Sequence, residues 1–328
     1  MALNNPPKEL LDFLIRFSGF YIVAHEEPDG DAIGSQLALA SFLKRRGKSV
    51  VLLSPGPWQR KEIAPYKELF QSSFPEANSP TEFAVLLLDC SSVDRAGYLS
   101  PYLKPYPLAV VDHHQPNGKL NSPIQYLEPR APSTTLLIQK IIEAFGEEPT
   151  KEEAHFIFFG FATDTGFFRH LEVEAADSLY HVGRLAEKEI TPKAIYRETF
   201  GNFSLQSRLY LAKILSTLES LFEGKLLLVH ILAQDYQTFD TEHRQSDPLY
   251  QLLLSVEGCE VVAFIREEET ERTSVSLRSP ANLNVAQIAQ SLGGGGHKNA
   301  SGYITPLPYQ AAKQQLLETL RPYLESLA

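Results

Sequence analysis

The sequence predicts an α/β fold: a doubly wound, mainly parallel sheet in the N-terminal part, followed by a smaller α+β domain. Two observations predict it. Apolar runs that suit buried parallel strands alternate with helical patterns up to about residue 190. From Lys225 onward the order of elements changes and includes a hairpin. We therefore expect a metal-binding catalytic domain at residues 1–190, a helical linker at 191–224 and a substrate-binding domain at 225–328.

In the N-terminal part, the predicted strands are continuous apolar runs and the predicted helices have apolar residues at helical spacing. Strands are expected at residues 20–24, 50–54, 83–89 and 108–111. Helices are expected at residues 6–17, 32–46, near 67, 133–146, 151–164, 174–189 and 203–222. Ser133 is expected to cap one of these helices, and Gly47 and Gly146 to end two of them. The helix at 203–222 is the expected connector between the domains.

The C-terminal part is expected to contain strands at residues 225–232, 259–268 and 271–279, the last two forming a hairpin. Helices are expected at residues 247–258, 284–292 and 308–327. Between the last two helices lies a run of four glycines, Gly293–Gly296, followed by His297. We expect this run to form a loop.

The composition is that of a globular protein, with no sign of covalent cross-links. The chain has 328 residues, of which 43% are hydrophobic and 21% charged, and its two cysteines fit neither a disulfide framework nor a cysteine-based zinc site. We see no signal-peptide pattern and no apolar run of about 20 residues that would cross a membrane. A cytoplasmic location is therefore expected. The formal net charge of −10 argues against a long nucleic-acid partner, because proteins that bind one usually carry a basic stripe.

Three of the predicted strands lead directly into side chains that bind metals. His25 follows strand 20–24, Asp89 ends strand 83–89, and Asp112, His113 and His114 follow strand 108–111. Because the carboxyl ends of parallel strands share one edge of a sheet, we expect these side chains to converge.

Further carboxylates lie close to these positions in the sequence or end a helix of their own. Asp29 and Asp31 follow His25, and Asp164 ends the helix at 151–164. Gly30 and Gly34 are expected to let the backbone turn tightly around whatever these side chains hold.

Converging carboxylates repel one another unless cations neutralise them, which favours a metal centre. Oxygen and imidazole ligands without a thiolate suit Mn²⁺, and also Mg²⁺, Fe²⁺ or Co²⁺, better than a structural zinc. Five or six ligands are more than one ion uses alongside water and substrate. Two ions about 3.5–4 Å apart are therefore expected, an arrangement that stabilises both oxygens of an in-line phosphoryl displacement.

Four segments, in chain order, resemble the four motifs of the DHH phosphoesterase family: HEEPDGDAIGS, LLLDCSSVDRAG, VVDHH and FATDTG. The later GGGGHKNASG resembles the glycine-rich signature of that family's associated C-terminal domain. In size the chain most resembles the stand-alone subfamily of nano-RNase/pAp phosphatases, whereas RecJ exonucleases are larger and add a nucleic-acid-binding domain. Glu27 stands where many relatives carry asparagine, which would alter hydrogen bonding around the ligands but removes none of them.

The resemblance implies a role for each candidate in the first domain. The six metal ligands would be His25 and Asp29 on one ion, Asp31, His113 and Asp164 on the other, and Asp89 as the bridge. The expected catalytic residues are Asp89, His113, His114 and Asp164. His114 would act on the scissile phosphate as a cation or hydrogen-bond donor, and Asp112 would orient the neighbouring histidines. The nucleophile would be a water or hydroxide held between the ions, its pKa lowered towards neutrality.

In the second domain, the resemblance implies residues that grip the substrate phosphate. Arg278 and the glycine loop would close over the substrate; the loop residues concerned are Gly294, Gly295, Gly296 and His297. Arginine suits a bidentate grip on phosphate, and glycines let backbone N–H groups approach an anion. Ser276 and Asn284 are weaker candidates.

The other residues with reactive or ionisable side chains have simpler interpretations. Cys90 is expected to be a small core residue. Asp94 and Arg95 either support the carboxyl edge of the sheet or form an ion pair at a helix start, and the ion pair is the preferred interpretation. The remaining histidines are expected to be structural or solvated: His155, His170, His181, His230 and His243.

The resemblance implies a two-metal phosphodiesterase that hydrolyses short oligoribonucleotides (nanoRNA) to 5′-mononucleotides and also removes the 3′-phosphate of pAp. The alternative within this class is a phosphodiesterase for cyclic di-AMP or pApA. From other classes, a catalytically silent nucleotide-binding regulator would lack at least one ligand, and GGGGH speaks against a family II pyrophosphatase. The expected partners are short RNA, pAp or pApA, with no long nucleic acid and no membrane. The oligomeric state is open, with a homodimer as one option.

Overall fold

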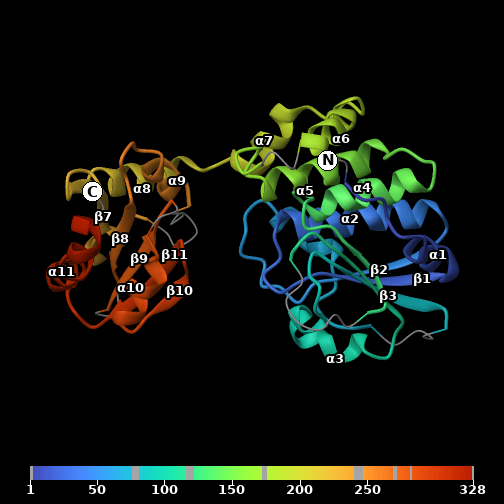
Figure 1. Ribbon diagram of the computed structural model, residues 1–328, viewed down its shortest axis with the longest axis horizontal. Helices are drawn as coiled ribbons and strands as arrows, with labels where there is room; N and C mark the ends of the chain where they lie inside the picture. Colours follow the sequence, from blue (N-terminus) through green and yellow to red (C-terminus); the bar gives the residue numbers. More distant parts are fainter. Residues whose placement is uncertain are drawn as a thin grey trace. The chain divides into compact units, whose positions relative to one another are not determined.

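The computed structural model describes residues 3–75, 81–115, 122–171, 176–239, 247–268, 272–280 and 283–326. It divides into two compact units, Met1–Asn202 and Phe203–Ala328, each with its own sheet (Figure 1). The division falls inside the segment 191–224 that the sequence suggested as a linker. In the described parts of the chain, no helix has the length and apolar character needed to cross a membrane.

The first unit contains a five-stranded parallel sheet in the order β2-β1-β3-β4-β5. Its strands are β1 (Gly19–Val23), β2 (Ser49–Leu53), β3 (Phe83–Leu88), β4 (Leu108–Asp112) and β5 (Ile124–Leu127). Val23 of β1 pairs with Leu87 of β3, which in turn pairs with Val110 of β4. The three central strands therefore end at one edge, and the predicted α/β fold is confirmed.

Helices cover both faces of this sheet (Figure 1). They are α1 (Lys8–Arg16), α2 (Gly30–Arg45), η1 (Ala64–Leu69), η2 (Val93–Leu99), α3 (Ser100–Leu103), α4 (Thr134–Ala144), α5 (Lys151–Asp164), α6 (Ala176–Ala186) and α7 (Pro192–Phe200). Because side chains alternate along a strand, Phe20 and Ile22 of β1 pack in the core under α1, α2, α4 and α5. Tyr21 and Val23 pack in the opposite core, with residues of η2 and α3.

Glycines let α2, α4 and α5 approach one another closely. A Cβ atom at Gly34 would lie 2.6 Å from the backbone oxygen of Phe156, and one at Gly30 would lie 2.3 Å from Thr163 Oγ1. Both glycines are inside helix α2. The expectation that they form a tight turn is therefore wrong: they are needed because α5 packs against their backbone.

The second unit contains a six-stranded mixed sheet in the order β10-β11-β9-β8-β7-β6. Its strands are β6 (Glu219–Leu221), β7 (Leu226–Ile231), β8 (Val261–Glu267), β9 (Thr273–Arg278), β10 (Gly295–His297) and β11 (Ala300–Thr305). Its helices are α8 (Leu205–Leu215), η4 (Ala233–Gln237), α9 (Asp247–Leu254), α10 (Val285–Ser291) and α11 (Tyr309–Ser326). Apolar residues of α8, η4 and α9 pack on one face of β7 and β8, and those of α10 and α11 pack on the other face of the sheet.

The expected helix at 203–222 ends early. α8 stops at Leu215, and β6 follows within the second sheet. The hydroxyl group of Thr217 donates to the carbonyl oxygen of His230 and accepts from the His230 N–H group, which draws the chain onto β7. Tyr210 and Ile214 of α8 also pack in a core of the second unit, so this helix belongs to that unit and is not a free connector.

Further elements were not expected from the sequence: β5, α3, α7, η4, and the hairpin of β10 and β11. β5 is a four-residue strand at the sheet edge and has no long apolar run. The end of the expected glycine loop is β10, an exposed three-residue strand that pairs with β11.

Candidate metal centre

The candidate site lies at the carboxyl edge of the first sheet, where β1, β3 and β4 end. His25 lies two residues after β1, Asp89 directly follows β3, and Asp112 is the last residue of β4. His25 and Asp89 are 8% and 2% exposed, and Asp112 is fully buried. The convergence expected from the sheet topology is thus present.

Helix α2 begins at this edge and brings two carboxylates. Asp29 caps the helix, and its Oδ1 accepts from the N–H groups of Asp31 and Ala32, at 3.0 Å each. Asp31 lies in the first turn and is 1% exposed. Asp164 comes from the last residue of α5. Because α2 packs closely on α5, Asp29, Asp31 and Asp164 lie together at this site.

Within this site, potential ligand atoms form three groups whose members lie within 4.8 Å of one another. The groups are His25, Asp29 and Asp89; Asp31, His113 and Asp164; and Asp89, His113 and His114. Asp89 belongs to two groups, and its two oxygens face different histidines. Its Oδ2 lies 3.4 Å from His25 Nε2, and its Oδ1 lies 3.6 Å from His113 Nε2.

The hydrogen bonds of two histidines fix which ring nitrogen faces the carboxylates. His113 Nδ1 lies 3.0 Å from the carbonyl oxygen of Ala131, and His25 Nδ1 lies 2.7 Å from that of Glu26. A carbonyl oxygen only accepts, so in both rings Nδ1 carries the hydrogen. In the neutral ring, Nε2 then presents a lone pair.

His113 Nε2 is buried and has no hydrogen-bond partner among the described residues. It faces Asp164 Oδ2 at 3.4 Å and Asp31 Oδ2 at 3.9 Å, in addition to Asp89. Lone pairs that face carboxylate oxygens in a buried site are stable when a cation lies between them. The ligand set therefore fits divalent metal ions.

The pKa values of the carboxyl groups also indicate a site that favours cations. Burial raises the pKa of Asp31 and of Asp89, and repulsion between neighbouring carboxylates adds to the effect. Burial and Asp31 raise the pKa of Asp164 to about 7. Hydrogen bonds from the N–H groups of Thr134 and Thr135 oppose the shift at Asp31. Metal ions would relieve the remaining repulsion.

His114 differs from the other two histidines of the site. Its Nδ1 lies 2.8 Å from Asp112 Oδ1, and this hydrogen bond raises the pKa of His114 to about 9. The ring is therefore a cation at neutral pH, and its side chain is 57% exposed. Asp112 also accepts from the N–H group of His114, which supports the orienting role expected for it.

The second unit places its predicted residues along one row of its sheet. β9 pairs Arg278 with Ala300, and β11 pairs Ala300 with His297, so Arg278 and His297 lie on the same face. The guanidinium group of Arg278 lies 4.6 Å from the ring centre of Tyr250, and His297 is exposed.

Of the neighbouring candidates in this unit, all except Gly295 have close structural contacts. A Cβ atom at Gly294 would lie 2.2 Å from the backbone oxygen of Gly302, and Gly296 has a φ of 137°. Gly295 has open space around its Cα atom. Asn284 caps α10, and the hydroxyl group of Ser276 accepts from Arg266.

The remaining candidates in the first unit also have structural contacts. Cys90 is a buried free thiol, as expected. Arg95 contributes its backbone carbonyl oxygen, which accepts from the N–H group of Glu26. His155 and His181 lie beside Glu198 and Glu143, and His170 is exposed.

In the second unit, His230 contacts the hydroxyl group of Tyr309. His243 lies outside the described residues.

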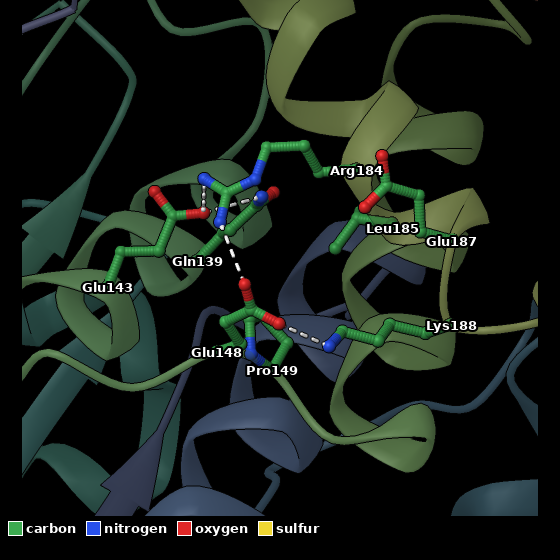
Figure 2. Close-up of a pocket in the computed structure, with 8 residues that line it drawn as sticks. All are labelled: Gln139, Glu143, Glu148, Pro149, Arg184, Leu185, Glu187 and Lys188. Carbon is green, nitrogen blue, oxygen red and sulfur yellow. Dashed lines mark hydrogen bonds and ion pairs between the residues drawn. The ribbon is translucent and has the colours of Figure 1, made fainter.

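The pocket drawn in Figure 2 lies between α4 and α6 and contains none of the candidate ligands. Ion pairs fill it, with Glu143 bound to Arg184 and Glu148 bound to Lys188. We interpret it as a structural contact between helices.

Sequence reasoning missed Thr134 and Thr135, whose donors contact the site carboxylates. Thr134 Oγ1 lies 2.9 Å from Asp89 Oδ1, and the two backbone N–H groups contact Asp31. The sequence does contain a run of serine and threonine at the expected helix start. This run indicated a helix cap, but it did not indicate that the start of the helix contacts the site carboxylates.

Comparison with known proteins agrees with this architecture. The DHH family N-terminal domain matches residues 19–161, and the DHHA1 domain matches residues 227–326. The fold and these matches define a member of a phosphoesterase family. The chain belongs to the DHH family, which confirms the resemblance drawn from its motifs.

Three similar proteins illustrate the range of the family. The chain is 30% identical to the bifunctional oligoribonuclease and PAP phosphatase NrnA of Thermus thermophilus, over 93% of this chain and 90% of that one. It is 23% identical to the cyclic-di-AMP phosphodiesterase PdeA of Listeria monocytogenes, over 96% of this chain, and spans about half of that protein (49%). The crystal structure of an exopolyphosphatase-related protein from Bacteroides fragilis superposes with a TM-score of 0.75 at 25% identity, covering 97% of this chain and 96% of that one.

Proposed function

We propose that this chain is a two-metal phosphodiesterase that hydrolyses short oligoribonucleotides to 5′-mononucleotides and removes the 3′-phosphate of pAp. The observation that carries the proposal is the pair of histidine Nε2 atoms that face buried carboxylates, at His25 and His113. The similarity to the NrnA protein over nearly the whole chain supports the substrate class.

Two ions account for all six candidate ligands. His25 and Asp29 would hold one ion, Asp31, His113 and Asp164 the other, and Asp89 both. Mn²⁺ is the ion we propose, because mixed carboxylate and imidazole ligands without thiolate suit it; Mg²⁺, Co²⁺ and Fe²⁺ fit the same set. When bound, such ions lower the pKa of a coordinated water and neutralise charge on phosphoryl oxygens.

The chain's own residues prepare the phosphate for attack. His114 is protonated at neutral pH and donates to an oxygen of the scissile phosphate, stabilising the charge that grows there. Asp112 holds the His114 ring in position through Nδ1. The buried carboxylates exclude other anions until cations have neutralised them.

Arg278 and His297 are the proposed grip on the terminal phosphate of the substrate, with Gly294, Gly295 and Gly296 as the adjoining backbone. Their place on one face of the second sheet supports this role. A grip on the terminal phosphate favours substrates of a few nucleotides over long chains. The net charge of −10 acts in the same direction.

Hydrolysis of cyclic di-AMP or pApA is the second candidate. The similarity to the PdeA protein favours it, although this chain spans about half of that relative. A silent regulator is disfavoured because every expected ligand is present at the site.

The test is a panel of substrates incubated with the purified protein and Mn²⁺. The panel contains pAp, pApA, cyclic di-AMP, pyrophosphate, and RNA from two to about twenty nucleotides. We expect mononucleotides from the shortest RNAs and AMP from pAp, with turnover falling as RNA lengthens. Preferred hydrolysis of cyclic di-AMP would establish the second candidate. Fast hydrolysis of pyrophosphate without release of mononucleotides would contradict both.

A further inference from the structure

Thr134, the first residue of α4, contacts two buried carboxylates of the site, Asp31 and Asp89. Its hydroxyl Oγ1 lies 2.9 Å from Asp89 Oδ1, and its backbone nitrogen lies 2.6 Å from Asp31 Oδ2. The Thr134 side chain is fully buried, and 45 residues separate it from Asp89 in the chain. None of the sequence motifs includes it.

The direction of the hydroxyl hydrogen bond follows from its partner. A carboxylate accepts only, so Thr134 donates to Asp89 Oδ1. This bond uses one of the two lone pairs of Oδ1 and leaves the other facing His113 and His114. Oδ2 is left facing His25. The hydroxyl group thus holds Asp89 in an orientation in which its two oxygens face different histidines, His113 and His25.

The backbone of Asp89 makes this support necessary. Asp89 has a φ of 58°, in the left-handed region that is strained for a residue other than glycine. Its carboxyl group is also repelled by Asp31, Asp29 and Asp164. A carboxylate held against strain and repulsion needs a specific donor to keep its rotamer.

The same turn also holds Asp31. The N–H groups of Thr134 and Thr135 donate to the two oxygens of Asp31, at 2.6 and 2.9 Å. One turn of α4, capped by Ser133, therefore fixes Asp31, a member of one ligand group, and Asp89, which belongs to the other two.

We propose that Thr134 is a positioning residue of the metal centre, whose hydroxyl group holds Asp89 as a bridge and so sets the affinity for the second ion. This inference rests on the proposed two-metal function. Residues that orient metal ligands typically change metal affinity by about 10- to 100-fold when they are replaced.

The experiment compares Mn²⁺ binding to the full chain and its variants. Thr134→Val removes the hydroxyl group and keeps the shape, whereas Thr134→Ser keeps the hydroxyl group. Thr199→Val is the matched control, because its hydroxyl group bonds to the backbone oxygen of Ile195 in α7, outside the ligand groups. Calorimetric titration measures the two affinities, and electron paramagnetic resonance detects exchange coupling between adjacent Mn²⁺ ions.

We expect Thr134→Val to weaken binding of the second Mn²⁺ about 10- to 100-fold and to lose the coupled signal. Thr134→Ser and Thr199→Val should resemble the wild type in both measurements. Equal affinity and coupling in Thr134→Val and the wild type would overturn the inference alone. A wild type that binds fewer than two Mn²⁺ ions would overturn the proposed function and the inference with it.

Folding is checked by circular dichroism in EDTA before any titration. If Thr134→Val does not fold, Thr134→Ala takes its place against Thr134→Ser under the same criteria. Equal Mn²⁺ affinities in the alanine and serine variants would then overturn the role of the hydroxyl group.

Discussion

His113 Nε2 lies 3.6 Å from Asp89 Oδ1, while the Nδ1 atom of the same ring is occupied by the carbonyl oxygen of Ala131. The imidazole is thereby held with its Nε2 atom towards a buried carboxylate. Such an arrangement is poorly stable alone and well suited to binding a cation between the two groups. The predictions about the site follow from the instability of this arrangement in the absence of a cation.

Replacing Asp89 with asparagine should stabilise the metal-free protein and abolish its response to Mn²⁺. Burial and Asp31 raise the pKa of Asp89 well above its usual range, so removing the charge removes repulsion. Asparagine also tolerates the left-handed backbone at this position. Thermal unfolding in EDTA should show a higher Tm for Asp89→Asn, where 1 kcal/mol corresponds to about 2–4 °C in a domain of this size.

Added Mn²⁺ should raise the Tm of the wild type and leave that of Asp89→Asn unchanged. Free ligand at 100 times its Kd stabilises by about 2.7 kcal/mol. Asp12→Asn, at an exposed position of α1, is the control and should behave as the wild type. A lower Tm for Asp89→Asn than for the wild type in EDTA would show that repulsion from the neighbouring carboxylates does not destabilise the protein at Asp89.

Replacing Gly34 with alanine should destabilise the first unit by about 1–3 kcal/mol, the range for overpacking a core. The added Cβ would lie 2.6 Å from the backbone oxygen of Phe156, which cannot move without displacing α5. Gly183→Ala is the matched control: it lies inside α6 with nothing within 4 Å of the new atom. There alanine should stabilise by about 0.5–1 kcal/mol. Denaturant unfolding measures both, and similar effects would argue against close helix packing.

Glu143 should contribute stability that disappears in acid. Burial alone would raise the pKa of Glu143, but the neighbouring His181, a hydrogen bond from Gln139 and the charge of Arg184 lower it below its ordinary value of 4.5. Figure 2 shows Gln139 and Arg184 beside Glu143. A lowered pKa in the folded state means that the contribution is present above about pH 4.5 and is lost as the pH falls through the lowered value.

The measurement compares the free energy of unfolding of the wild type with that of Glu143→Gln across pH. The difference should stay constant from pH 7 to about pH 5.5 and shrink below pH 4.5. A difference that grows in acid would mean that the pKa is raised.

Replacing Arg278 with alanine should raise the KM for substrates that carry a terminal phosphate by about 10- to 100-fold. This range corresponds to the loss of one hydrogen bond to a charged group, about 1.5–3 kcal/mol. Hydrolysis of an aryl phosphodiester without that phosphate should change little. Arg321→Ala removes the same charge from exposed α11 and should affect neither substrate. Equal losses on both substrates in Arg278→Ala would assign the residue a structural role.

The central part of the fold was predictable because its strands are buried on both faces. The residues of β1, β3 and β4 form continuous apolar runs, and such runs are typical of a parallel sheet. β5 and β10 lie at sheet edges and have four and three residues, too few for a pattern. The end of α8 depends on the contact between Thr217 and His230, which no local pattern reveals.

For the candidate site, the positions of the ligands were predictable from the order of strands, because Asp89 and His113 directly follow strands that end at one edge. The hydrogen bonds that hold these ligands in place were not predictable from the sequence. Thr134 acts through the tertiary approach of α4 to the end of β3, and the carbonyl oxygen of Ala131 through its contact with His113. The metal-binding and catalytic roles of the site residues stay predictions.

Anomalous diffraction at the manganese edge, from crystals grown with Mn²⁺, tests the two-metal claim most directly. We predict two peaks in the first unit, one bound by His25 and Asp29 and the other by Asp31, His113 and Asp164, with Asp89 bound to both. A single peak, or two peaks that do not share Asp89, would contradict the account.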